Sequence, residues 1–239
     1  LRLAAVAAGG IALLFIGWRL RLRNPGYAVG MQGAGVAVLY LTTFGALRQR
    51  IEQAFGLAEL RLGAGRGADS MVGLTLGTGV GGVIAIDGRV VLGHDGTAGE
   101  VGHHTIDPDG PPCNCGNNGC LEAFARADRI AEACGTETVE AAVEAARGGD
   151  VRALEGLASV GRYLGIGIAN MIVLLSPDRV IIGGGIAASA DLLLGAIRDE
   201  VQRRVQTTSL SVVEIVTAEL GTWAGAIGAA VHGAEEAEA

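Results

Sequence analysis

Residues 70–92, SMVGLTLGTGVGGVIAIDGRVVL, decide the fold of this chain. Residues 70–76 and 83–86 are mostly apolar and lie on either side of a glycine-rich turn, and short apolar runs bounded by turn signals predict strands. The Asp-Gly pair at 87–88 is a strong signal for a two-residue hairpin, and it leads into a third predicted strand over 89–92. We therefore expect an antiparallel meander of three strands at the start of a sheet.

The sequence after the meander alternates between helical and strand patterns. Helices are predicted over residues 121–134, 137–147, 151–175, 188–205 and 222–232, and strands over 178–182 and 211–216. The longest predicted helix repeats apolar residues at helical spacing, which indicates one face packed in the core; they are Leu154, Leu157, Leu164, Ile168 and Ile172. Strands in hairpins, followed by strands that alternate with helices, predict a mixed α/β sheet. The acidic tail, 234–239, is predicted to fray.

The first 47 residues differ in composition from the rest of the chain, because they consist mainly of long apolar runs. Two apolar runs, 3–18 and 27–47, are joined by a short arginine-rich connector, and together they resemble the helical hairpins of bacterial multi-span membrane proteins. A pair of buried helices is the alternative, because the first run is slightly shorter than the roughly 17–25 residues of a membrane span. We place a domain boundary near residue 47, where an amphipathic helix begins the globular part of the chain.

Composition excludes two classes of protein. Hydrophobic residues make up 50% of the chain, mean hydropathy is +0.42 and only 18% of residues are charged, which excludes an intrinsically disordered protein. The formal net charge is −7 and the isoelectric point is near 5.1, whereas binding to a nucleic-acid backbone needs clustered cations. We therefore expect no nucleic-acid partner.

Three of the four cysteines, Cys113, Cys115 and Cys120, lie close together, and His103 precedes them. Three thiolates and one imidazole are a typical ligand set for a tetrahedral Zn²⁺ ion. Closely spaced thiols also favour a metal over a disulfide framework, and a reducing compartment over an oxidising one. His104 is an alternative fourth ligand that spacing alone does not exclude.

Two glycine-rich turns follow predicted strands, and they are Gly77-Thr78-Gly79 and Gly183-Gly184-Gly185. Glycine lets backbone N–H groups approach a phosphate closely, and Thr78 adds a hydroxyl donor. Glycine turns are also common between strands that bind nothing, so each turn taken alone allows either interpretation.

These segments resemble, in the right order, the motifs of the repressor/ORF/kinase (ROK) family. The motifs are Gly77-Thr78-Gly79-Val80-Gly81-Gly82, Ala98-Gly99-Glu100-Val101-Gly102-His103, Cys113-x-Cys115-Gly-x-x-Gly-Cys120-x-Glu122 and Ile182-Gly183-Gly184-Gly185. The resemblance covers about residues 48–239 and implies an actin-like ATPase lobe of the ribonuclease H-like class. It also implies an ATP-dependent kinase of hexoses or N-acetylhexosamines, glucokinase-like, or a sugar-responsive repressor.

The resemblance implies a role for each matching residue. Glu100, His103 and Glu122 would contact sugar hydroxyls. His103, Cys113, Cys115 and Cys120 would hold Zn²⁺. Gly77, Thr78, Gly79, Gly183, Gly184 and Gly185 would line the site for ATP, which an active kinase binds with Mg²⁺.

The sequence also departs from the family's pattern. It holds neither an Asp-x-Gly-Gly-Thr phosphate loop nor the Asn-Asp pair whose Asp would be the catalytic base, so no catalytic residue is predicted. We expect a truncated sugar kinase with impaired turnover, because phosphoryl transfer depends on positioning and electrostatics. The alternative is a non-catalytic sugar-binding or regulatory protein tethered to a membrane. A repressor is disfavoured, since no helix-turn-helix precedes the ROK-like part and the net charge is negative.

ATP and reduced thiols are both found in the cytoplasm, so the ROK-like part is expected there. Residues 1–47 would add an association with a membrane if they insert. The sequence predicts neither the identity of the sugar nor the oligomeric state, and a homo-oligomer stays open.

Overall fold

The structure is a computed structural model that describes residues 51–238. Contacts divide the chain after Leu47, and the described residues all belong to the second unit, Arg48–Ala239. The predicted helical hairpin over residues 1–47 lies outside the described residues and stays a prediction.

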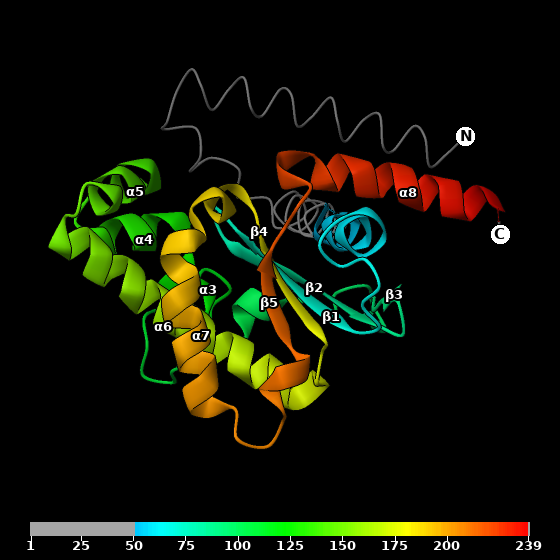
Figure 1. The fold of residues 1–239 in the computed structure, drawn as a ribbon, viewed down its shortest axis with the longest axis horizontal. Helices are drawn as coiled ribbons and strands as arrows, with labels where there is room; N and C mark the ends of the chain where they lie inside the picture. The colour runs from blue at the N-terminus through cyan, green and yellow to red at the C-terminus, as the bar shows by residue number, and fades with distance from the viewer. Residues whose placement is uncertain (1–50, 239) are drawn as a thin grey trace, which may run out of the picture. The chain divides into compact units, whose positions relative to one another are not determined.

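Five strands of the described chain form one mixed sheet: β1 (Met71–Leu76), β2 (Val80–Ile86), β3 (Arg89–Val90), β4 (Arg179–Gly183) and β5 (Glu214–Thr217). Their order is β3-β2-β1-β4-β5 (Figure 1). The strands β1, β2 and β3 are antiparallel, whereas β1, β4 and β5 run parallel to one another. The predicted meander and the mixed α/β sheet are therefore confirmed.

The glycine-rich turn is shorter than the sequence suggests. Only residues 77–79 separate β1 from β2, and the first N–H of this turn donates to its third carbonyl at 3.0 Å. Gly81 and Gly82 lie inside β2, paired with β1, and not in the turn. A Cβ on Gly82 would stand 2.1 Å from Val101 Cγ2, so β2 needs glycine where the 3-10 turn η2 (Val101–His103) packs against it.

Helices cover both faces of the sheet. They are a helix over residues 51–62, α3 (Glu122–Ala125), α4 (Ala127–Cys134), α5 (Val139–Arg147), α6 (Val151–Leu175), α7 (Asp191–Arg204) and α8 (Ala224–Glu238). The 3-10 turns η3 (Gly185–Ser189), η4 (Leu210–Val212) and η5 (Gly221–Trp223) precede α7, β5 and α8. Helices α4 to α7 lie on one face of the sheet, and the first helix and α8 lie on the other (Figure 1).

Successive residues of the central strand β1 enter two different cores. Val72 and Leu74 are fully buried in the core shared with α6 and α7. Met71 is fully buried in the second core, where it packs with Phe55 of the first helix. This burial on both faces explains why β1 is an almost continuous apolar run in the sequence.

The long helix α6 is the main core helix. Four of its five predicted core residues are buried, namely Leu157, Leu164, Ile168 and Ile172. The prediction is wrong for Leu154, which is 42% exposed, because the first turns of α6 approach α4 through Ala153 and Gly156 instead. Within the described chain α6 is long and apolar enough to cross a membrane, but 56% of its most apolar window is buried.

The predicted helix over residues 121–134 is divided at Arg126, whose ψ of 159° is extended. The next residue, Ala127, donates its N–H to the Gly77 carbonyl at 2.9 Å instead of continuing the first helix. The break therefore joins α3 and α4 to the turn between β1 and β2, a contact that local sequence does not reveal.

The helix over residues 51–62 is joined to the C-terminal part of the chain by polar contacts. The fully buried carboxylate of Glu59 accepts N–H groups from Ala64, Glu219 and Leu220 at 2.8, 3.2 and 3.0 Å. Arg61 pairs with Glu235 at 2.7 Å. Helix α8 extends beyond the predicted end at residue 232 and continues through this contact to Glu238, whereas the predicted fraying of the tail stays a prediction.

Two substitutions on α6 test this account of the core. We expect Ile168→Ala to lower the free energy of unfolding by about 2–5 kcal/mol, because it removes a fully buried side chain and leaves a cavity. Leu154→Ala on the same helix should change it by less than about 1 kcal/mol, because that side chain is largely in water. Urea unfolding followed by circular dichroism measures both, and equal losses would contradict the packing described.

Candidate functional site

Three cysteines and one histidine form a cluster at the end of η2 and in the loop that follows it. The ligand atoms of His103, Cys113, Cys115 and Cys120 all lie within 4.8 Å of one another. Sγ of Cys113 is 3.6 Å from Nδ1 of His103, and Sγ of Cys115 is 3.6 Å from Sγ of Cys120. The structure therefore brings together the four side chains that the sequence singled out for Zn²⁺.

The loop over residues 104–121 folds back on itself to make this cluster. An isolated bridge pairs Thr105 with Cys120 at the base of the loop. At its outer end the Gly116 N–H donates to the Cys113 carbonyl at 3.0 Å, which closes a four-residue turn. Gly116 has a φ of +94°, a conformation that glycine adopts at little cost.

The rival ligand His104 faces a different environment. Its Nδ1 lies 2.5 Å from the Val101 carbonyl, to which it donates. Its ring packs against α6, where a Cβ on Gly167 would stand 3.2 Å from Cε1 of His104. The His104 ring therefore lies between the loop and α6, while His103 points into the cluster.

The thiols of the cluster differ in their affinity for a proton. Burial raises the pKa of the Cys113 thiol, and it raises the pKa of Cys120 to about 12. The exposed Cys115 has a lowered pKa, chiefly because the Asn117 N–H donates to its sulfur. A nearby cation is therefore needed to hold the two buried sulfurs as thiolates at neutral pH. All cysteines of the cluster are free, and the donor set of three sulfurs and one imidazole fits Zn²⁺.

Two carboxylates flank the cluster. Glu122 is 3% exposed, its Oε2 accepts the Val80 N–H at 3.0 Å and its Oε1 lies 3.9 Å from Cys113 Sγ. Glu100 is more exposed, and its Oε2 lies 3.8 Å from Nε2 of His103. The structure thus places Glu122 between the sheet and the cluster, and Glu100 at the outer side of His103.

A small cavity of about 260 Å³ opens beside the cluster. Its lining combines the β1–β2 turn, the cluster and α3, and the residues are Thr78, Gly79, His103, Asn114, Cys115 and Glu122. Glu100 is not among them and reaches this site through His103. A carboxylate, an imidazole, a hydroxyl and an amide therefore face one polar hollow, which suits a ligand with many hydroxyl groups.

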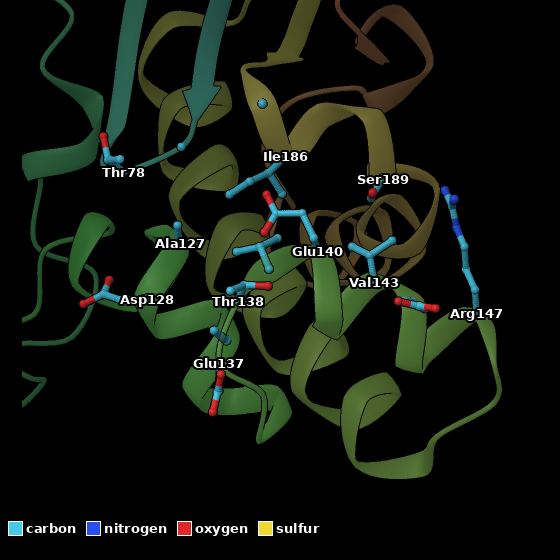
Figure 2. Close-up of a pocket in the computed structure, with 15 residues that line it drawn as sticks. Thr78, Ala127, Asp128, Glu137, Thr138, Glu140, Val143, Arg147, Ile186 and Ser189 are labelled. Atoms are coloured by element: carbon cyan, nitrogen blue, oxygen red, sulfur yellow. The ribbon is translucent and has the colours of Figure 1, made fainter.

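A larger cavity of about 830 Å³ lies on the other side of the β1–β2 turn. It is bounded by that turn, by α4, by one face of α5 and by η3, from which Ile186 and Ser189 line it. Figure 2 shows the carboxylate of Glu140 directed toward Ile186, whereas Glu137 points away. Thr78 lines both cavities, so the two hollows lie next to each other at the β1–β2 turn.

Of the five glycines and Thr78 that were predicted to line a nucleotide, some line a cavity and others do not. Gly77, Thr78 and Gly185 line the larger cavity, and Gly79 lines the smaller one. Gly183 and Gly184 are in neither lining. Gly183 is buried, and a Cβ on it would stand 2.6 Å from the Phe55 ring, whereas Gly184 is exposed, and a Cβ on it would stand 2.3 Å from the Leu76 carbonyl.

Sequence reasoning missed Asn114 in the small cavity and the whole contribution of α5 to the large one. The lining residues of α5 include Glu140, Val143, Glu144 and Arg147, whose spacing marks one helix face. The sequence shows that these residues share one helix face, but it does not show that this face lies near the β1–β2 turn.

Residues 50–235 match the family model described as "ROK family". The chain belongs to the ROK family. The family resemblance inferred from the sequence is thereby confirmed for this domain. Residues 1–50 match the model of a family described as a predicted membrane protein (DUF2339), a match to a minor part of the chain.

The ROK domain is similar to kinases and to repressors. It is 38% identical over 196 residues to the glucokinase of Thermotoga maritima, which covers 74% of this chain and 62% of that protein. It is 32% identical over 170 residues to the xylose repressor of Bacillus subtilis, which covers 70% of this chain and 44% of that protein. The chain thus spans less than two thirds of the length of these curated relatives.

Solved structures agree on the fold. The crystal structure of a ROK family glucokinase from Streptomyces griseus, in complex with glucose and AMPPNP, matches with a TM-score of 0.71 and 31% identity. The match covers 76% of this chain and 66% of that chain. The expected actin-like ATPase fold is therefore confirmed for the ROK domain.

Substitution of each neighbouring histidine tests which one belongs to the cluster. We expect His103→Gln to weaken zinc binding by at least about 10-fold, because it removes one donor of the set. His104→Gln should retain one zinc ion per chain, because its ring faces α6. Competition with a chromophoric chelator measures both affinities, and zinc loss in the His104 variant alone would contradict this arrangement.

Proposed function

We propose that the ROK domain is a sugar-kinase lobe of the glucokinase type, which binds a hexose in the small cavity and ATP with Mg²⁺ in the large one. The observation that supports this most is the position of Thr78, which lines both cavities. Phosphoryl transfer needs the two substrates in contact. Two cavities that share one lining residue suit that requirement.

The hexose would be held by the polar groups of the small cavity. Glu122 lies in the lining and has a carboxylate, a group that accepts hydrogen bonds from sugar hydroxyls. Glu100 and His103 would add contacts from the outer side of the cluster. An N-acetylhexosamine offers the same vicinal hydroxyls and is the second substrate class that we propose.

Zinc would give this site its rigidity. Its four proposed ligands include His103, and Cys120 lies two residues before Glu122. A metal that fixes both segments would hold the two sugar-contacting side chains in place without touching the sugar. Zinc is thus proposed as a structural ion.

The nucleotide would occupy the larger cavity, with its phosphates at the β1–β2 turn. Gly77 and Thr78 line the cavity there, where Thr78 can offer its hydroxyl to a phosphate, and Gly185 lines it at the start of η3. ATP supplies the phosphoryl group when it is bound. This chain's own contribution is to bind and orient it.

The sequence does not favour rapid phosphorylation of the sugar. No Asn-Asp pair occurs in the 239 residues, so we propose that sugar binding is retained while phosphorylation is weak. The similarity to the xylose repressor supports a second candidate, a non-catalytic sugar-binding or regulatory protein. Both candidates use the same small cavity, and turnover distinguishes them.

We expect the full chain to bind glucose weakly and to phosphorylate it at least about 10²-fold more slowly than the Streptomyces griseus glucokinase, since a positioned base typically contributes about 10²–10⁴-fold. Calorimetry measures binding, and an assay coupled to glucose 6-phosphate oxidation measures turnover. Comparable turnover would show that another residue of this chain acts as the base.

A pair of glutamate substitutions serves as the control for binding. Glu122→Ala should abolish measurable glucose binding, whereas Glu132→Ala, an exposed residue of α4 paired with Arg129, should not change it. Equal binding by both variants would place the sugar elsewhere. Zinc content should be measured in each variant, because a loss of metal would also disturb the cavity.

We further propose that the ROK domain is cytoplasmic and that residues 1–47 associate with a membrane. The full chain should then sediment with membranes after an alkaline wash, because residues 3–18 and 27–47 hold long uncharged apolar runs. Residues 48–239 expressed alone are expected in the supernatant. Recovery of the full chain in the supernatant would favour a pair of buried helices.

A further inference from the structure

Asn114 lies at the wall of the small cavity. It is the second residue of the turn closed by the hydrogen bond from the Gly116 N–H to the Cys113 carbonyl. Its neighbours on both sides, Cys113 and Cys115, belong to the cluster. The backbone at Asn114 is therefore held from both sides, and its side chain can meet a ligand at low cost in conformational entropy.

The side chain of Asn114 has no hydrogen-bond partner within residues 51–238. Asn117 in the same loop differs, because its amide donates to the Thr105 hydroxyl at 3.0 Å and its carbonyl oxygen accepts the Asn118 N–H at 2.9 Å. Asn117 therefore supports the loop, whereas the amide of Asn114 remains available to a ligand.

The small cavity has few side chains that can donate a hydrogen bond. The Glu122 carboxylate accepts hydrogen bonds, and Nδ1 of His103 faces the Cys113 sulfur, whereas Nε2 of His103 lies 3.8 Å from Glu100, too far for a hydrogen bond, and can donate to a ligand. The Thr78 hydroxyl and the Asn114 amide are the other side chains of its lining that can donate, besides the weak thiol donor of Cys115. A sugar hydroxyl that donates its proton to a carboxylate still carries lone pairs that need a donor.

We infer that the Asn114 amide donates to one hydroxyl oxygen of the bound hexose and thereby contributes to the choice of sugar. This inference rests on the proposed function of the small cavity. It assigns to the residue between the first two cysteines of the loop a part in sugar recognition, separate from the metal. A pocket that hydrogen-bonds a hydroxyl rejects analogues that lack it, because its own polar group is then left unpaired.

The test compares Asn114→Ala with Asn118→Ala in the full chain. Asn118 belongs to the same loop but not to the cavity lining, so it is the matched control. The sugar is whichever of glucose, mannose and N-acetylglucosamine the unaltered chain binds most tightly in a titration by saturation-transfer NMR. We expect Asn114→Ala to weaken binding by about 3- to 10-fold, Asn118→Ala to leave it unchanged, and both variants to keep one zinc ion.

Monodeoxy analogues of the same sugar then give a readout that a merely structural role would not produce. One analogue, which lacks the partner hydroxyl, should bind the Asn114 variant and the unaltered chain equally, while the others keep the 3- to 10-fold ratio. An Asn114 variant that binds the parent sugar normally would overturn the inference, as would a loss shared equally by all analogues. Absence of binding by the unaltered chain would overturn the proposed function and this inference with it.

Discussion

A buried hydrogen bond, from the Val80 N–H to the Glu122 carboxylate at 3.0 Å, joins the sheet to the cysteine loop. Val80 is the first residue of β2, directly after the turn that borders both cavities, and Glu122 is the first residue of α3. A hydrogen bond to a carboxylate is stronger than one between neutral groups, so loss of the Val80 donor would weaken the attachment of the cysteine loop to the sheet. The relative position of the turn and the cluster depends on this contact.

The sheet explains why the two cavities lie where they do. The strands β1 and β4 are parallel, so the turn after β1 and the segment that begins at Gly184 emerge at the same edge. Ligands of open α/β sheets bind outside the carboxyl ends of such strands. Burial of β1 on both faces holds this edge rigid, because neither core can shift without the other.

Membership of the ROK family does not by itself decide between catalysis and regulation. The relatives similar to this chain include a glucokinase and a xylose repressor, and one fold can serve both because function depends on the residues of the site. The cluster and Glu122 border the small cavity, which we propose as the sugar site, and the sequence contains no Asn-Asp pair. The chain's chemistry therefore depends on a few side chains around one turn.

Features that depend on neighbouring residues were predictable from the sequence. The hairpin at 87–88 and the apolar run of β1 are local patterns, and the cysteines of the loop are close enough along the chain for their convergence to be expected. The core face of α6 was also predicted, apart from Leu154, because helical periodicity indicates one buried face.

Tertiary packing decided the rest, because the residues concerned are distant in sequence. The helix break before Ala127 depends on the Gly77 carbonyl, and the face of α5 borders a turn that lies far from it along the chain. The sequence alone indicated the three cysteines, the two histidines and the two glutamates as candidate ligands. Only the folded chain decided that Thr78 borders both cavities and that His103, not His104, points into the cluster, because these facts depend on how separate elements pack.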